Sequence, residues 1–176
     1  MLLEDNKIKI LRLFFEGPME RLHLREIARR VGLSATGAMK ILAALEKEGF
    51  LKKERDMNTI RYQGNYENEK FKALKKSLNF YSLYSCGLIS KIADFYNTPE
   101  AIILFGSYAK GEDTKESDID LAVVSTRKEH PSLNTYELAL KRKISLHVIK
   151  NIKNAEKEFV NTIANGVVLY GYLEVL

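Results

Sequence analysis

Apolar positions recur at helical spacing in three short segments of the first third of the chain, and two strand-like segments follow them. This pattern predicts the order helix, helix, turn, helix, hairpin. Ser34 can cap the third helix through its hydroxyl group, Gly49 can end it, and its apolar residues are expected to face inward, Met39 among them. The helices are predicted over residues 6–15, 24–31 and 34–48, and the hairpin strands over residues 50–54 and 60–63, joined by the polar tip 55–59.

Residues 66–97 continue the helical spacing and predict a connector made of one long helix or two helices in series. The segment is rich in aromatic side chains, which we expect to pack between the domains or across a homodimer. A platform for stacking nucleobases is the alternative. The aromatic residues are Phe80, Tyr81, Tyr84, Phe95 and Tyr96.

After Pro99 the pattern changes to short apolar strands separated by polar segments, which is typical of an α/β arrangement. Strands are predicted over residues 101–105, 119–124, 144–149 and 167–172, and helices over residues 133–140 and 154–163. The whole chain is therefore expected to be α+β. It would comprise an N-terminal domain (1–65), a helical connector (66–97) and a C-terminal domain (98–176) with a small mixed sheet.

Charge is unevenly distributed along the 176 residues, which carry 28 Lys and Arg, 23 Asp and Glu, and a formal net charge of +5. Residues 1–65 hold 13 basic and 9 acidic side chains, so +4 of this excess lies in the N-terminal third. This asymmetry is compatible with a polyanion partner for this part of the chain, but a charge of +4 by itself is equally typical of a solvated surface.

Cysteine usage and hydropathy exclude several classes of protein. Cys86 is the single cysteine, so no internal disulfide can form. The longest stretch without charge, residues 77–90, is too short to span a bilayer, and the first ten residues have no apolar block behind a basic head. We expect a cytoplasmic protein with no membrane partner.

The candidate chemistry lies around the first two predicted C-terminal strands, in the stretch ILFGSYAKGEDTKESDIDLAVV. Residues two apart in a strand point to the same face, so Asp118 and Asp120 should project side by side while Ile119 enters the core. Two parallel carboxylates suit Mg²⁺, which prefers carboxylates together with phosphates and water. Gly106 permits close backbone approach, and Ser107 offers a hydroxyl and an N–H group to a phosphate oxygen.

The spacing G-S, ten residues, D-x-D resembles the signature of the nucleotidyltransferase superfamily that includes DNA polymerase β, in particular its minimal nucleotidyltransferases. Gly106, Ser107, Asp118 and Asp120 match residue for residue, Ser117 also fits, and the resemblance covers about residues 82–173. It implies transfer of a nucleoside monophosphate from an NTP, with ATP favoured, to an acceptor hydroxyl. It also implies two Mg²⁺ ions held by three carboxylates, with metal ligands at Asp118 and Asp120 and nucleotide contacts at Gly106, Ser107 and Ser117.

The third carboxylate is where the sequence departs from the family. The family often has an apolar-Asp-apolar triplet on the later strand, and here Ser145 stands at that position. His147 has the same strand parity and is a candidate catalytic base, since a neutral imidazole accepts a proton but binds Mg²⁺ poorly. A strand histidine satisfied by a hydrogen bond is the alternative, and Glu156 and Glu158 are further candidates.

The stretch LREIARRVGLSATGAMKILAALEKEGFLKK resembles winged helix-turn-helix domains, with the small Ala28 in the second helix and Gly32 at the turn. The resemblance covers about residues 7–64 and implies that the third helix enters the major groove of double-stranded DNA while the wing rests on phosphates. Use of this domain for dimerisation or protein docking is the alternative. The candidate DNA-binding residues are Arg25, Arg29, Ser34, Thr36, Lys40, Lys52, Lys53, Arg55 and Arg61.

Two hypotheses of function follow. The first is a Mg²⁺-dependent nucleotidyltransferase that modifies a hydroxyl of a protein or small molecule and also binds DNA. Some minimal nucleotidyltransferases act as antitoxins that adenylylate a HEPN-domain toxin, so the resemblance makes such a toxin a candidate partner. The second is a transcriptional regulator whose nucleotidyltransferase domain is an inactive nucleotide sensor or docking module, which the missing third Asp favours.

Overall fold

The chain forms two compact units, Met1–Lys75 and Lys76–Leu176. The computed structural model describes residues 5–17, 20–56, 59–152 and 155–174. Helix α4 (Glu69–Ser85) contributes residues to both units, and each unit is described by itself below.

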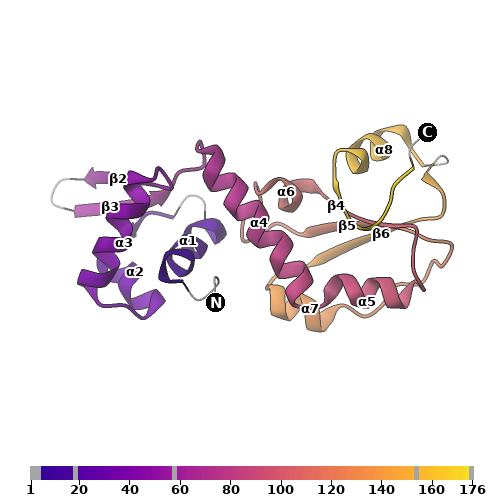
Figure 1. Cartoon of the computed structure of the whole chain (residues 1–176), viewed down its shortest axis with the longest axis horizontal. Helices are drawn as coiled ribbons and strands as arrows, with labels where there is room; N and C mark the ends of the chain where they lie inside the picture. Colours follow the sequence, from indigo (N-terminus) through magenta and orange to yellow (C-terminus); the bar gives the residue numbers. More distant parts are fainter. Residues whose placement is uncertain (1–4, 18–19, 57–58, 153–154, 175–176) are drawn as a thin grey trace. The chain divides into compact units, whose positions relative to one another are not determined.

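The first unit has the predicted winged helix-turn-helix order, with its helices packed beside a small sheet (Figure 1). Its antiparallel sheet has the strand order β1-β3-β2. Strand β1 was not expected; its two residues pair with Tyr62 and Arg61 of the wing. Residues 57 and 58 of the predicted hairpin tip lie outside the described residues. The elements are α1 (Asn6–Glu16), β1 (Leu22–His23), α2 (Leu24–Val31), α3 (Ala35–Lys47), β2 (Leu51–Asp56) and β3 (Thr59–Gly64).

The core of the first unit comes from the apolar faces of its helices. Phe14 of α1, Ile27 of α2 and Leu42 of α3 are fully buried. The predicted cap of α3 is confirmed, because the Ser34 hydroxyl accepts the Gly37 N–H at 3.1 Å. The expectation that Met39 faces inward is wrong: its side chain is 50% exposed, since it lies outside the narrow apolar stripe that α1 and α2 cover.

The second unit is built on a four-stranded mixed sheet with the order β6-β5-β4-β7. Strand β4 is antiparallel to both of its neighbours, whereas β5 and β6 are parallel. The predicted strands are confirmed, and the additional helix α6 begins directly at the end of β4. Residue 154 of the predicted last helix lies outside the described residues. The elements are α5 (Leu88–Phe95), β4 (Ala101–Phe105), α6 (Gly106–Lys110), β5 (Ile119–Val124), α7 (Asn134–Leu140), β6 (Ile144–Ile149), α8 (Lys157–Ala164) and β7 (Val167–Gly171).

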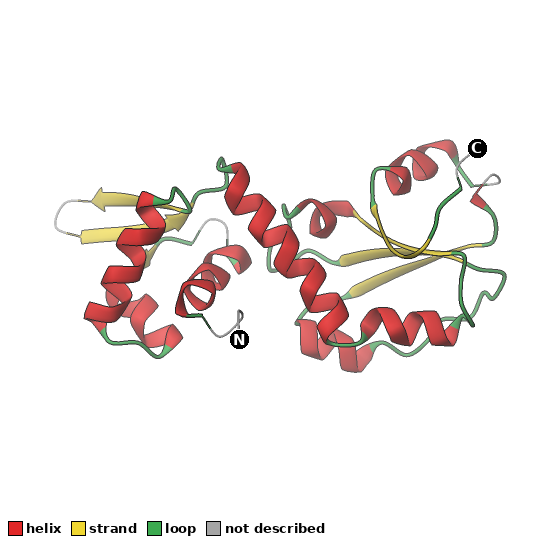
Figure 2. Cartoon of the chain, viewed as in Figure 1, coloured by secondary structure: helices red, strands yellow, loops and turns green. Residues whose placement is uncertain are grey.

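Helices cover both faces of this sheet, as the secondary-structure view in Figure 2 shows. One face packs Leu104 and Leu121 against α5, α7 and the C-terminal part of α4. The opposite face packs Ile103 and Ala122 against α8. Because side chains alternate along a strand, the residues of β5 with even numbers, including Asp120, project on the α8 face.

The predicted connector consists of two helices in series, α4 and α5. Gly87 separates them with φ of +81°, a left-handed conformation that ends the first helix. Among the described residues, no helix combines the length and the apolar character needed to cross a bilayer.

Candidate active site

Gly106 and Asp120 meet where the first two strands of the second unit lie side by side. Phe105, the last residue of β4, pairs in register with Asp120 of β5, and the chain turns at Gly106 with φ of +74°. A β-carbon on Gly106 would lie 2.2 Å from Oδ2 of Asp120, so only glycine leaves room for the carboxylate. This contact brings the Gly-Ser turn and the predicted catalytic carboxylate into one site.

Asp118 completes a carboxylate pair with Asp120. Strand β5 begins at Ile119, so Asp118 immediately precedes the strand instead of lying inside it, and Ile119 is fully buried as expected. Partial burial raises the pKa of Asp120, an electrostatic interaction with His147 lowers it, and the negative charge of Asp118 raises it further. The two carboxylates therefore interact electrostatically, as a pair on one side of the sheet should.

The donor set suits a divalent cation only in part. Asp118 and Asp120 supply the hard oxygen ligands that Mg²⁺ prefers, and substrate phosphates and water would complete its coordination. Within the described residues, no group of three His, Cys, Asp or Glu side chains is placed to hold a metal. The site thus fits one cation, for which Asp118 and Asp120 supply some ligands and the nucleotide phosphates supply others.

Ser145 lies beside Asp120, at the position where the family resemblance led us to expect a third carboxylate. It pairs in register with Asp120 across β5 and β6. Its Oγ lies 3.3 Å from Nε2 of His147, which is exposed and shares the α8 face. The His147 ring also lies 5.6 Å from the rings of Phe105 and Phe159, centroid to centroid. Both alternatives for His147 therefore have a physical basis: the ring is hydrogen bonded, and it is also accessible near the carboxylates.

Ser107 and Ser117 take different places around the carboxylates. Ser107 is half-buried in the first turn of α6, directly after Gly106. The Ser117 hydroxyl accepts the Thr114 N–H at 2.9 Å and so closes a turn immediately before Asp118. Ser117 therefore has an evident role in shaping the loop, besides the nucleotide contact that the sequence predicts.

A buried ion pair anchors the same loop. The Asp113 carboxylate is 2% exposed, lies 3.4 Å from the Arg142 guanidinium and accepts a hydrogen bond from Asn79 at 2.8 Å. Arg142 also donates to the Lys115 carbonyl oxygen. The loop that ends at Asp118 is thus fixed at several points to residues distant in sequence.

Two hollows lined by cations flank the carboxylate pair. A hollow of about 570 Å³ beside Gly106 contains Lys76 and Lys110. A second hollow, of about 700 Å³ beside Asp118, has a lining of mixed charge: basic Lys115, Lys141, Arg142 and Lys143, and acidic Glu116 and Glu137. Sequence reasoning did not assign these cations to the site, since Lys76, Lys110, Lys115 and the basic run 141–143 lie far apart along the chain. The pair Lys76 and Lys110 beside Gly106 suits the binding of a polyphosphate.

The candidate DNA-binding residues lie on two parts of the first unit. Arg25 and Arg29 are exposed on α2, and Thr36 and Lys40 are exposed on α3. On the wing, Lys52 Nζ lies 2.7 Å from Glu67 and Lys53 Nζ lies 3.8 Å from Glu46, while Arg55 is exposed and Arg61 is half-buried. Ser34 is occupied in capping α3.

Comparison with known proteins finds a family match in each of the two units. Residues 88–174 match the family described as Polymerase beta, Nucleotidyltransferase, and residues 5–55 match the IclR helix-turn-helix domain. A protein of Methanocaldococcus jannaschii named "Putative protein adenylyltransferase" is 42% identical over 62 residues, which cover 31% of this chain and 62% of that relative. The match therefore spans about three fifths of the relative's own length.

Two solved structures resemble parts of the chain. The crystal structure of the predicted DNA-binding transcriptional regulator from E. coli is 26% identical, with a TM-score of 0.35 over 43% of this chain and 77% of that one. A variant of ZitR from Lactococcus lactis is 13% identical, with a TM-score of 0.37 over 50% of this chain and 60% of that one.

Proposed function

We propose that this chain transfers a nucleoside monophosphate from an NTP to a protein hydroxyl and also binds double-stranded DNA. In this chain, a nucleotidyltransferase domain of the polymerase beta type follows an IclR-type helix-turn-helix domain. The observation that carries the proposal is the site formed by Gly106, Asp118 and Asp120, in which the Asp120 carboxylate packs against Gly106 and interacts electrostatically with Asp118. ATP is the favoured donor because the M. jannaschii relative is named an adenylyltransferase.

The nucleotide would be held by its phosphates. The backbone at Gly106 and the hydroxyl and N–H groups of Ser107 offer hydrogen bonds, and Lys76 and Lys110 line the adjacent hollow. Asp118 and Asp120 would hold Mg²⁺ together with phosphate oxygens. The bound Mg²⁺ would neutralise charge that develops on the phosphates. A bound cation would also offset the repulsion from Asp118, which adds to the effect of burial in raising the pKa of Asp120.

The transfer forms a bond between the acceptor oxygen and the α-phosphorus and breaks the bond between that phosphorus and the leaving pyrophosphate. The proton of the acceptor hydroxyl must go to a base. In this proposal His147 accepts it, because the exposed imidazole lies on the same sheet face as Asp120 and is oriented by the Ser145 hydroxyl.

Calorimetric titration with a non-hydrolysable ATP analogue, with and without Mg²⁺, tests the nucleotide site. We expect binding that depends on Mg²⁺ and is abolished in Asp118→Asn/Asp120→Asn, with an unchanged circular dichroism spectrum. Unchanged affinity in that double variant would rule out the site. Pyrophosphate release in the presence of an acceptor protein then tests transfer itself.

The acceptor is proposed to be a protein, since the second unit has 101 residues and would depend on a partner that brings its own binding surface. Family resemblance makes a HEPN-domain toxin the first acceptor to try. A mass increase of one adenylyl group on such a protein, absent with the double Asn variant, is the supporting result.

A second candidate function rests on Ser145. Because an uncharged side chain stands in register beside Asp120, the second metal site of the family would lack a ligand. The domain would then sense or store a nucleotide and regulate DNA binding through the first unit. Nucleotide binding without pyrophosphate release from any acceptor, together with nucleotide-dependent DNA affinity, would favour this function.

A further inference from the structure

Strand β6 forms one edge of the sheet in the second unit. It pairs only with β5 within the order β6-β5-β4-β7, so among the described ranges no strand covers its outer side. An uncovered edge presents N–H and C=O groups to whatever extended chain comes beside it.

The hydrogen-bond pattern shows which residues of β6 face outward. The carbonyl groups of Lys143 and Ile149 accept from Ile119 and Ser125, so residues with odd numbers face β5. The N–H and C=O of one strand residue point to the same side, and residues with even numbers therefore face away from the sheet. Consistent with this, the outward N–H of Ile144 donates to the Glu137 carboxylate at 2.9 Å. Leu146 and Val148 are next along this outward edge.

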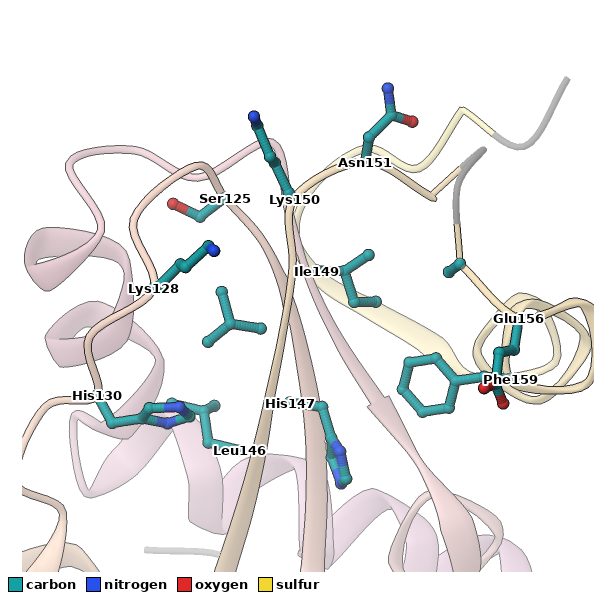
Figure 3. Close-up of a pocket in the computed structure, with 12 residues that line it drawn as sticks. Ser125, Lys128, His130, Leu146, His147, Ile149, Lys150, Asn151, Glu156 and Phe159 are labelled. Atoms are coloured by element: carbon teal, nitrogen blue, oxygen red, sulfur yellow. The ribbon is translucent and has the colours of Figure 1, made fainter.

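A groove of about 810 Å³ follows the same edge (Figure 3). Its lining follows β6 from Leu146 to Ile149 and continues to Asn151, beyond the end of the strand. In the figure Lys128 and His130 lie on one side of the strand, and Phe159 and Glu156 lie on the other, where α8 begins. The outward backbone of β6 thus lies between two walls that would flank an added strand above and below.

The charges of this groove distinguish among possible occupants. Lys128 and Lys150 are exposed and basic, and among the described residues Glu156 is the only acid that lines the groove. A second copy of this chain, paired edge to edge, would bring these cations together and is disfavoured by repulsion. An extended segment that carries acidic side chains is complementary.

The groove also leads to the carboxylates. Ser145 pairs with Asp120, and His147 borders both the groove and the carboxylate pair. A strand added outside β6 would run about two strand spacings, or roughly 10 Å, from β5. A hydroxyl side chain on its α8 face could reach across Ser145 toward Asp120.

We propose that the outer edge of β6 binds an extended, acidic segment of the acceptor protein as an additional β-strand. Hydrogen bonds to the main chain of Leu146 and Val148 would hold the segment, and Lys128 and Lys150 would select its acidic side chains. In this mode of recognition, main-chain hydrogen bonds give affinity, and contacts to every second side chain of the added strand give selectivity. The inference rests on the proposed function for the identity of the acceptor, but docking itself needs no nucleotide.

Amide hydrogen exchange on the full chain tests the docking. The probe is a blocked ten-residue peptide of alternating glutamate and valine, added without nucleotide. We expect exchange at the Leu146 and Val148 amides to slow at least tenfold, because these donors become hydrogen bonded. The same peptide with every backbone amide methylated should give no protection, and a version with lysine for glutamate should bind at least tenfold more weakly.

Val148→Pro and Val148→Ala form a matched pair of variants. Proline removes only an outward donor at this position, which an edge strand tolerates, whereas alanine keeps the donor and shortens the side chain. Peptide affinity should fall roughly fivefold further in Val148→Pro than in Val148→Ala, as one lost hydrogen bond predicts. If the proline variant does not fold, the methylated peptide on the unaltered chain decides the matter.

The outcomes separate this inference from the proposed function. Absence of protection at Leu146 and Val148 under saturating peptide, with nucleotide binding intact, overturns the docking proposal alone. Protection by the peptide with no nucleotide binding overturns the proposed function and supports the docking edge. Protection without peptide that grows with protein concentration, or protection by an oligonucleotide in place of the peptide, also overturns the proposal.

Discussion

The Asp120 carboxylate lies directly against the α-carbon of Gly106, with Oδ2 only 2.2 Å from where a β-carbon would be. This contact links the end of β4 to the second residue of β5. Any side chain at Gly106 would displace the carboxylate from the position it holds beside Asp118.

Gly106→Ala should therefore reduce Mg²⁺-dependent binding of the ATP analogue at least tenfold. The matched control is Gly87→Ala, because Gly87 has a similar φ of +81° but no atom within 4 Å of the added carbon. Each variant should lose about 1 kcal/mol in free energy of unfolding, since alanine is strained at positive φ. Titration calorimetry and urea unfolding measure the two effects. Equal nucleotide affinity in the two variants would contradict the prediction.

Asp120→Asn should be more stable than the parent chain at pH 7 in the absence of divalent metal. Partial burial raises the pKa of Asp120 above the value of about 3.9 in an unfolded chain, so its ionisation disfavours the folded state. The penalty is absent below the unfolded pKa and appears as pH rises through the folded one. Urea unfolding at pH 7 and pH 3 measures the difference between the proteins, which should vanish at pH 3. A parent at least as stable as the variant at pH 7 would contradict it.

Ser145→Asp should raise the rate of pyrophosphate release and the affinity for Mg²⁺. The new carboxylate would stand in register beside Asp120 and supply the ligand that this chain lacks. Ser145→Asn is the matched control, because it has nearly the same size without the charge. We expect at least a tenfold difference between the two variants in a coupled pyrophosphate assay. Indistinguishable rates would show that Ser145 does not occupy the position of the third ligand.

Replacement of the wing cations Lys52, Lys53 and Arg55 by Ala should weaken binding to double-stranded DNA. The ion pairs of Lys52 and Lys53 are exposed, so phosphates can compete for these side chains. The slope of log affinity against log salt should fall by up to about 3, close to 0.9 for each lost phosphate contact. Fluorescence anisotropy at several salt concentrations measures it.

The control for the wing variant is the triple change of Lys9, Lys70 and Lys72 to Ala, which removes the same charge from outside the predicted DNA-binding face. Its salt slope should stay near that of the parent. An equal loss of slope in both triple variants would indicate that net charge, not the wing, governs DNA affinity.

The strands of the second unit could be predicted from the sequence because buried strands leave long apolar runs. The predicted bounds 101–105, 119–124 and 144–149 match the structure. Strand β1 could not be predicted, since its two residues are held by main-chain bonds to the wing and carry no periodicity. Helix α6, with five residues, is likewise too short for a helical pattern.

The candidate site could likewise be predicted only in part from the sequence. The Gly-Ser turn and the D-x-D pair could be located because they are local in sequence, and the structure brings Gly106 against Asp120. The cations of the flanking hollows could not be located, because Lys76, Lys110 and Lys141 lie on separate elements. The same is true of the Asp113–Arg142 pair, whose partners are 29 residues apart.

The Asp113–Arg142 pair has a consequence for the energetics of ligand binding. It fixes the loop before Asp118 in the free protein, together with the turn closed by Ser117. The site is therefore preorganised, and less of the interaction energy with a nucleotide is lost to ordering the chain. A protein built in this way responds to its ligand as a rigid receptor, and the heat of binding should reflect contacts with the phosphates instead of folding of the loop.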